Sequence, residues 1–219
     1  MIVAEGLHVV LQGRTVLDGV GFQVRRGEAV ALVGANGSGK TTVLRCLLGL
    51  VPFTGRAQIG GHDVVREPVA ARTLTGYLPQ RPAFGDMTAE EALRFLAKLR
   101  RVPVEGVLPA LSRVGLERYA TASARTFSGG MQQRLSLAAA LLADPPVLLL
   151  DEPTASLDRA GQQSFLELAA SLRDEGRTLL LASHRAGEIA QLTSRVIELH
   201  EGRPLASEPG VVPLRRSFP

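Results

Sequence analysis

A glycine-rich segment at residues 34–42 has the residue types and spacing with the most evident chemistry. It reads Gly34-Ala35-Asn36-Gly37-Ser38-Gly39-Lys40-Thr41-Thr42 and fits the phosphate-loop pattern G-x-x-x-x-G-K-[ST]. Glycines let the backbone curl until several N–H groups point at one anion, and the lysine can reach β- and γ-phosphates. The threonine after the lysine offers a hydroxyl to Mg²⁺. We therefore predict a nucleotide site made by Gly34, Asn36, Gly37, Ser38, Gly39, Lys40, Thr41 and Thr42.

The segments on both sides of this loop favour the same interpretation. Residues 28–33 are mostly apolar and predict a buried strand, and residues 43–50 place apolar side chains at helical spacing. A loop between a strand and a helix also lies at the positive end of the helix dipole, which attracts phosphate. The alternative is a glycine-rich turn that only caps a helix. It requires a chance match in a chain whose only lysines are Lys40 and Lys98.

Two adjacent carboxylates are the next candidates. The apolar run 147–150 predicts a strand buried on both faces of a parallel sheet, and Asp151 and Glu152 follow it directly. Ligands in such sheets bind beyond the carboxyl ends of the strands. We predict that Asp151 holds Mg²⁺ and that Glu152 polarises the water that attacks the γ-phosphate. Without the phosphate loop, two solvated acids would be the simpler interpretation.

Single polar residues follow two other predicted strands. His184 follows strand 178–183, which we expect beside the strand of Asp151, so its ring can reach the γ-phosphate. Gln80 ends strand 75–79 at the junction with a helical block, where its amide can contact Mg²⁺ or water and couple that contact to subdomain motion. A structural histidine and an ordinary hinge residue are the alternatives.

A second candidate anion site lies at Ser128-Gly129-Gly130, which opens a predicted helix over 128–142. A serine and two glycines at a helix N-terminus provide a cap and accessible N–H groups. One chain therefore offers one phosphate loop and one separate anion site. This pairing favours head-to-tail association of two chains around two nucleotides.

The order of the predicted elements sets a helical block into an α/β chain. Residues 2–24 predict a hairpin, and a capping box at 88–91 opens the helical block. Strands and helices alternate again from residue 147 to residue 199, as in a parallel sheet. The expected helices cover residues 88–99, 107–114, 128–142, 162–175 and 186–192.

The composition indicates a globular protein without a membrane span. Its longest apolar run, 137–143, is far shorter than the about 18 residues that cross a bilayer, and the N-terminus has no signal pattern. Cys46 is the only cysteine, so no internal disulfide is possible, which suits a reducing cytoplasm. The net charge of +4 comes from scattered arginines with few aromatics between them, so we expect no nucleic-acid partner.

Taken together, these motifs resemble the ATP-binding subunits of ABC transporters. The resemblance rests on residues 34–42, Gln80, Phe127-Ser128-Gly129-Gly130-Met131-Gln132-Gln133-Arg134, residues 147–153, Ser156-Leu157-Asp158 and His184. It implies an α/β fold with a P-loop NTPase (RecA-like) core, a mostly parallel sheet, an N-terminal antiparallel β-subdomain and an inserted helical subdomain. The implied ABC ATPase domain covers residues 1–207. Within it the core and β-subdomain occupy 1–80 and 145–207, the helical subdomain occupies 81–144, and a tail occupies 208–219.

The resemblance also implies an activity and partners. Two copies would bind ATP and Mg²⁺ as an ATP-sandwich dimer. In it Ser128 and Gly130 bind the γ-phosphate held by the partner, Gly129 is a further nucleotide-binding residue, and Asp158 lies in the facing loop. Hydrolysis would drive a separate membrane permease, with the chain in the cytoplasm at the inner face of the cell membrane. The run 76–80 and the helix after it look most like subunits of two-component exporters.

Three positions depart from the family pattern. Leu11 stands where an aromatic residue usually stacks on adenine, and Phe127 and Met131 replace the outer residues of the usual Leu-Ser-Gly-Gly-Gln signature. Because the Ser-Gly-Gly core and Glu152 are intact, we expect hydrolysis to survive. Two alternatives stay open: a soluble ABC-type ATPase that serves cluster assembly or DNA maintenance, and a P-loop NTPase outside the family.

Overall fold

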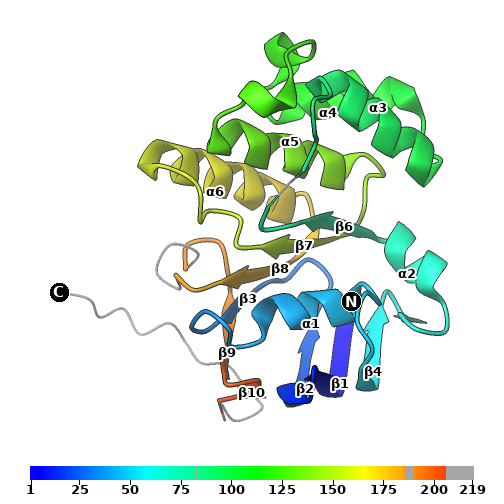
Figure 1. Ribbon diagram of the computed structural model, residues 1–219, viewed down its shortest axis with the longest axis vertical. Helices are drawn as coiled ribbons and strands as arrows, with labels where there is room; N and C mark the ends of the chain where they lie inside the picture. The colour runs from blue at the N-terminus through cyan, green and yellow to red at the C-terminus, as the bar shows by residue number, and fades with distance from the viewer. Residues whose placement is uncertain (82, 186–189, 206–219) are drawn as a thin grey trace.

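A central six-stranded sheet organises the computed structural model, which describes residues 1–81, 83–185 and 190–205 (Figure 1). Five strands run parallel, and β10 at one edge is antiparallel to its neighbour. In order across the sheet the strands are β10 (Arg203–Pro204), β9 (Arg195–His200), β3 (Ala29–Val33), β8 (Thr178–Ser183), β7 (Val147–Asp151) and β6 (Thr75–Leu78).

A second, antiparallel sheet lies at the bottom of the molecule in Figure 1. Its strands, in spatial order, are β2 (Arg14–Val24), β1 (Ile2–Leu11), β4 (Thr54–Ile59) and β5 (His62–Asp63). The hairpin predicted over residues 2–24 is confirmed, and the turn between β1 and β2 has positive φ at Gln12 and Gly13. Because β2 packs close to the start of α1 (Lys40–Leu47), this sheet supports the loop that precedes that helix.

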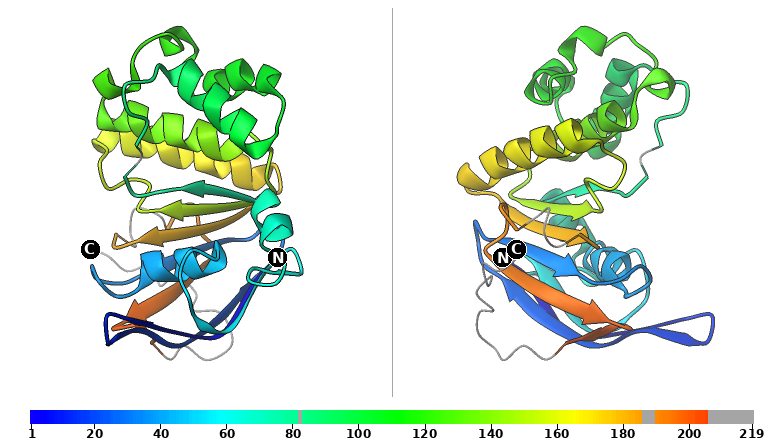
Figure 2. Two further views of the ribbon diagram at one scale, coloured as in Figure 1. Left: turned by 45° about the vertical axis from the view of Figure 1, so that its right-hand side comes forward. Right: turned by 90° about the vertical axis from the view of Figure 1, so that its left-hand side faces the viewer.

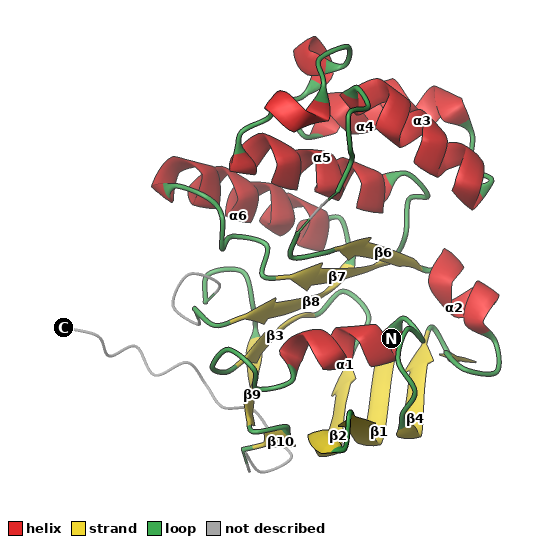
Figure 3. Cartoon of the chain, viewed as in Figure 1, coloured by secondary structure: helices red, strands yellow, loops and turns green. Residues whose placement is uncertain are grey.

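Helices cover the central sheet on both faces (Figure 3). α1 lies on one face, and α5 (Gly129–Leu141) and α6 (Arg159–Asp174) lie on the other. α3 (Ala89–Arg100) and α4 (Val107–Arg113) stack on the far side of α5, away from the sheet (Figure 2). α2 (Pro68–Thr73) lies between β5 and β6, and single 3₁₀ turns occur at Val104–Gly106, Glu117–Tyr119 and Ala124–Thr126.

Strand β3 divides the hydrophobic core into two parts, because successive side chains of a strand point to opposite faces. Ala29, Ala31 and Val33 belong to the cluster that includes residues of α5 and α6. Val30 and Leu32 belong to the cluster that includes α1 and the antiparallel sheet. All five residues are buried, which explains why this strand is an unbroken apolar run in the sequence.

The predicted α/β fold class is confirmed, and several predicted element boundaries are wrong. α1 begins at Lys40 rather than Val43, so the lysine of the phosphate loop is itself in the first helical turn. α6 begins at Arg159 rather than Gln162, because the Asp158 carboxylate accepts a hydrogen bond from the Gly161 N–H, 2.8 Å away, and caps the helix there.

Other expectations for the helices have mixed outcomes. The capping box predicted at 88–91 is confirmed at the start of α3, whereas α2 was not predicted. Of the expected helix 186–192, residues 186–189 lie outside the described residues and residues 190–192 are not helical. The tail at 208–219 also lies outside the described residues. In the described part of the chain, every helix falls short of the length and hydropathy that a bilayer span requires.

Candidate functional site

The phosphate loop connects the end of β3 to the start of α1, as the sequence predicts. Gly34 and Gly39 both have positive φ, 154° and 102°. A Cβ at Gly34 would lie 2.3 Å from the Leu199 carbonyl oxygen, and one at Gly39 would lie 2.6 Å from a methyl of Leu17. Glycine is therefore required at these positions by close packing against β9 and β2 as well as by backbone conformation.

Lys40 turns its ammonium group back over this loop. Its Nζ donates to the carbonyl oxygens of Gly34 at 2.8 Å and Ala35 at 3.0 Å. It also lies 3.5 Å from Oε1 of Glu152, and both side chains are only 6% exposed. The buried Lys40 ammonium therefore contacts two carbonyl oxygens and the Glu152 carboxylate. A buried cation with these neighbours is well placed to bind an anion that enters the loop.

Ser38 supplies an independent sign that the loop fits a phosphate. Its Oγ is buried and has no hydrogen-bond partner among the described residues. A buried hydroxyl without a partner costs free energy, and an oxygen of a bound phosphate would remove that cost. The remaining predicted loop residues are more accessible: Asn36 and Gly37 are exposed, and Thr41 and Thr42 are half-buried.

Asp151 ends strand β7, and only 1% of its surface is exposed. Each of its two oxygens accepts from a hydroxyl: Thr41 Oγ1 lies 3.0 Å from Oδ1, and the Tyr77 hydroxyl lies 3.4 Å from Oδ2. Burial raises the pKa of Asp151, and the neighbouring charge of Glu152 adds to that effect, while the Thr41 hydroxyl opposes it. Burial also raises the pKa of Tyr77 to about 12, so its phenol keeps its proton and is the donor.

Asp151 and Thr41 are suitable ligands for Mg²⁺ because a hard cation prefers oxygen donors. Among the residues that the structure describes, no three His, Cys, Asp or Glu side chains gather into a metal cluster. A magnesium ion here would therefore need phosphate oxygens and water in addition to these two side chains, which is the usual arrangement for Mg²⁺ at nucleotides. The residues fit a metal that arrives together with a nucleotide.

Glu152 lies one residue beyond Asp151, with a φ of 48° that is uncommon outside glycine. Its backbone N–H donates to the Ala182 carbonyl at 2.9 Å, which holds this conformation. Its Oε2 lies 2.8 Å from Nδ1 of His184, at the end of neighbouring strand β8. The Nε2 of His184 accepts from Arg185 Nε at 3.3 Å, so the proton is on Nδ1 and is donated to Glu152. Nothing in the sequence distinguishes Arg185, because one arginine in a basic chain is no signal.

The structure thus brings together Lys40, Thr41, Asp151, Glu152 and His184. In Figure 1 the carboxyl ends of β7 and β8 point to the left, the side on which the phosphate loop leads into α1. Gln80 follows β6, the neighbour of β7, and is exposed. Its predicted contact with Mg²⁺ or water stays a prediction.

Ser128, Gly129, Gly130 and Asp158 form a separate group. Ser128 caps α5 by accepting the Met131 N–H at 3.3 Å, and Asp158 caps α6. A Cβ at Gly129 would lie 2.9 Å from the Ser156 carbonyl oxygen, so the two caps belong to one packed surface. Among the described residues, the side-chain bonds of both caps stay within their own helices. Their role toward a nucleotide stays a prediction.

Comparison with known proteins identifies the family. The family model for the ABC transporter matches residues 17–155. The Nod factor export ATP-binding protein I of Ralstonia nicotianae is 37% identical over 208 residues, which cover 92% of this chain and 65% of that protein. The ATP-binding cassette sub-family A member 7 of Rattus norvegicus is 36% identical over 211 residues, which cover 93% of this chain. They cover only 10% of the rat protein, so this chain corresponds to part of such relatives.

Solved structures agree with the sequence comparison. An ATP-binding subunit of an ABC transporter superposes with a TM-score of 0.83 at 30% identity, covering 94% of this chain and 88% of that one. The cbiO1 protein of Clostridium perfringens, part of the ABC transporter complex cbiONQ, superposes with a TM-score of 0.83 at 26% identity, covering 94% and 86%. The chain therefore belongs to the ABC transporter family, whose ATP-binding domains are ATPases, and the predicted family and enzyme class are confirmed.

Proposed function

We propose that this chain is the ATP-binding and ATP-hydrolysing subunit of an ABC transporter that drives a separate membrane permease, in an exporter-type system. The observation that carries the proposal is the meeting of Lys40, Glu152 and His184 at the end of the phosphate loop. The exporter assignment rests on the similarity to a protein named for Nod factor export. A peripheral position at the cytoplasmic face of the cell membrane belongs to the same proposal.

Each residue at this edge has a distinct task in the proposed reaction. Lys40 and the loop residues Gly34, Asn36, Gly37, Ser38, Gly39 and Thr42 bind the phosphates. Thr41, Asp151 and Gln80 would hold Mg²⁺, and the bound ion neutralises charge on the phosphate oxygens.

Hydrolysis itself is assigned to Glu152. Its carboxylate accepts a proton from a water molecule as the water oxygen bonds to the γ-phosphorus and the bond to ADP breaks, which leaves ADP and inorganic phosphate. His184 keeps the carboxylate in place through Nδ1, 2.8 Å from Oε2. Its proposed contact with the γ-phosphate would require Nε2 to give up the bond from Arg185 and to carry a proton of its own. Lys40 is shared between the carboxylate and the loop, so an arriving phosphate would release Glu152 from that ion pair.

A second copy of the chain is the proposed partner for the exposed group around Ser128. Ser128 and Gly129 are exposed at the start of a helix, where the dipole and accessible N–H groups attract an anion. In the proposed ATP sandwich, Ser128, Gly129 and Gly130 contact the γ-phosphate bound by the other copy, and Asp158 faces that copy.

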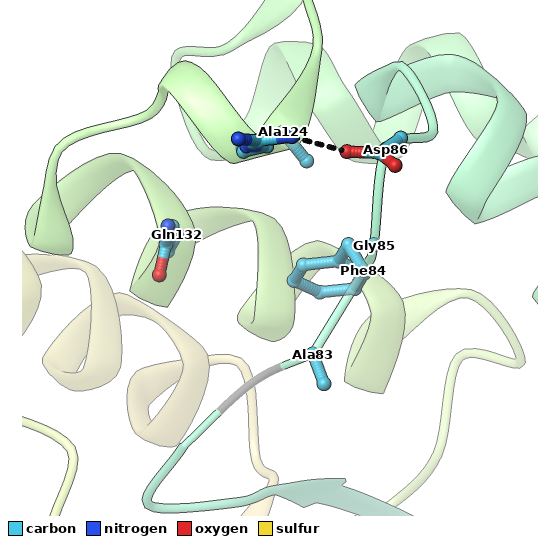
Figure 4. Close-up of a pocket in the computed structure, with 7 residues that line it drawn as sticks. Ala83, Phe84, Gly85, Asp86, Ala124 and Gln132 are labelled. Carbon is cyan, nitrogen blue, oxygen red and sulfur yellow. Dashed lines mark hydrogen bonds and ion pairs between the residues drawn. The ribbon is translucent and has the colours of Figure 1, made fainter.

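The proposed permease contact lies in a pocket of about 340 Å³ beside the segment that follows Gln80 (Figure 4). Phe84 points into the pocket, Gln132 of α5 lies opposite, and Asp86 forms an ion pair with Arg125 at 3.2 Å across its rim. The pocket thus lies between the segment after β6 and α5, inside the proposed helical subdomain 81–144. The proposed core and β-subdomain at 1–80 and 145–207 complete the domain, with 208–219 as its tail.

Site-directed photocrosslinking tests the permease assignment. A photoreactive residue placed at Ala83, which lines the pocket, should crosslink in membranes to a protein with several membrane spans, identified by mass spectrometry. The same probe at Arg56, exposed on the antiparallel sheet, is the control and should not crosslink to that protein. Crosslinks from Arg56 but not from Ala83 would overturn the assignment, and crosslinks only to soluble proteins would overturn the transport function.

A further inference from the structure

Tyr77 contacts the proposed magnesium site, yet none of the steps above uses it. It lies on β6 and pairs in register with Leu149 of β7. Side chains two residues apart on a strand share a face, so Asp151 lies on the same face as Leu149, one step toward the end of the strand. The half-buried Tyr77 ring packs against the core cluster on that face, and its hydroxyl donates to Asp151 Oδ2 at 3.4 Å.

This contact matters because Asp151 is almost fully buried, with 1% of its surface exposed. A buried carboxylate needs a donor for each oxygen, and here Thr41 serves Oδ1 and Tyr77 serves Oδ2. Thr41 is itself a proposed magnesium ligand, so its hydroxyl is not reserved for Asp151 when a nucleotide is bound. The Tyr77 hydroxyl is not a proposed magnesium ligand, so it can donate to Asp151 in both states.

We propose that Tyr77 is a positioning residue that orients the Asp151 carboxylate for Mg²⁺ through its phenol hydroxyl. The inference rests on the proposed function, since it concerns the same nucleotide site. Donors to a metal-binding carboxylate fix its orientation, and their removal typically lowers metal affinity about 10–100-fold. Because the Tyr77 bond is long for a hydrogen bond to a carboxylate, we expect the lower end of that range.

The matched variants are Tyr77→Phe and Tyr119→Phe, which remove only a hydroxyl from the two tyrosines of the chain. Tyr119 packs edge-on against Phe127, with ring centroids 6.3 Å apart, and the phenylalanine variant keeps that contact. For each protein, binding of a fluorescent ATP analogue is measured in EDTA and then while Mg²⁺ is titrated. The melting temperature is recorded in parallel.

In Tyr77→Phe the Mg²⁺ concentration that gives the half-maximal effect should rise about tenfold, with affinity in EDTA unchanged. The melting temperature should fall slightly, because one oxygen of the buried Asp151 carboxylate loses its donor. Excess Mg²⁺ should restore wild-type binding, and Tyr119→Phe should match the wild type throughout. An unchanged Mg²⁺ dependence in Tyr77→Phe would overturn the inference. A loss of affinity that is equal in EDTA and excess Mg²⁺ would also overturn it, because it indicates a structural role. If the wild-type protein itself shows no Mg²⁺-dependent ATP binding, the proposed function fails instead.

Discussion

His184 and Glu152 form a hydrogen-bonded pair across two neighbouring strand ends, with Nδ1 2.8 Å from Oε2. The second carboxylate oxygen lies 3.5 Å from the Lys40 ammonium, so the charge of Glu152 is shared between a histidine and the lysine of the phosphate loop. The carboxylate is only 6% exposed, so few water molecules can reach it. This geometry suits a general base that acts on a single, oriented water molecule.

Replacement of Glu152 by glutamine should separate ATP binding from hydrolysis. The amide keeps the shape of the side chain but loses the negative charge that accepts the proton, and a general base typically contributes about 10²–10⁴-fold. Phosphate release should fall by that factor, while a fluorescent ATP analogue still binds. Lys40→Ala is the contrasting variant and should lose binding itself, because it removes the cation that contacts the phosphates. Wild-type turnover by Glu152→Gln would show that another group is the base.

The same glutamine variant should form a stable dimer with Mg-ATP and run as a monomer without nucleotide on a sizing column. Addition of Ser128→Arg should abolish the dimer, since an arginine at the exposed start of α5 fills the space proposed for the partner's phosphate. Ser112→Arg, at an exposed serine of α4, is the matched control and should leave the dimer intact. A dimer that survives Ser128→Arg would contradict the sandwich arrangement.

Introduction of an aromatic ring at Leu11 should strengthen ATP binding. Leu11 ends β1 and is half-buried against the core. In the family pattern an aromatic ring at this position stacks on adenine, and a leucine cannot supply that stacking, which is worth about 0.5–1.5 kcal/mol. Leu11→Tyr should therefore tighten ATP binding several-fold and reduce competition by GTP. Val10→Tyr places the same ring on an adjacent, 50% exposed position and should have no such effect. Equal ATP affinities of Leu11→Tyr and the wild type would contradict the stacking argument.

The turn between β9 and β10 should be needed for a stable phosphate loop. The Gly202 N–H donates to the Ser38 carbonyl at 3.1 Å, and a Cβ at Gly202 would lie 2.2 Å from the Val16 carbonyl oxygen. Gly202→Ala should lower the melting temperature and weaken ATP binding. Gly27→Ala is the control because Gly27 has φ 74°, close to the 78° of Gly202, and a Cβ there would make only an ordinary contact.

Both variants acquire the strain of a left-handed alanine, about 1 kcal/mol or more. Only Gly202→Ala also displaces the backbone that supports Ser38. ATP affinity should therefore fall in Gly202→Ala and stay unchanged in Gly27→Ala. Equal ATP affinities in the two variants would show that the turn does not support the loop.

The ion pair between Glu28 and Arg195 should make stability depend on pH. Burial would raise the pKa of Glu28, but the Arg195 guanidinium at 3.1 Å and the Arg25 N–H at 2.8 Å outweigh it and hold the pKa below 4.5. A lowered folded-state pKa means that the pair stabilises the fold above pH 4.5. The stabilisation is lost as the pH falls through the folded-state pKa.

Glu28→Gln should therefore melt lower than the wild type at pH 7, by a few degrees if the pair contributes about 1 kcal/mol. The difference should vanish at a pH below the folded-state pKa, because the wild-type carboxyl is then also neutral. Glu198→Gln, at an exposed position of β9, is the control and should show no such difference. Differential scanning fluorimetry across this pH range measures both. A difference that is constant with pH would contradict the linkage.

Site residues that belong to a short sequence motif could be predicted from the sequence. The phosphate loop combines glycines, a lysine and a threonine within nine consecutive residues, and Asp151 and Glu152 follow an apolar run that can only be a buried strand or helix. The capping box before α3 is likewise a pattern within four residues. In each case the physical cause acts over one or two turns of chain, so a short segment contains the whole signal.

Contacts between distant segments were decided only by the tertiary structure. Tyr77 and Asp151 are 74 residues apart, and Thr41 and Asp151 are 110 apart, so no local pattern can pair them. In the sequence Gly202 is an ordinary turn glycine, and only the structure shows that its N–H donates a hydrogen bond to the Ser38 carbonyl. The sequence alone thus determined which groups are proposed to bind phosphate and metal, because that depends on residue type. The packing of β6, β7 and the β9–β10 turn decided which other groups hold them in place, because that depends on which strands become neighbours.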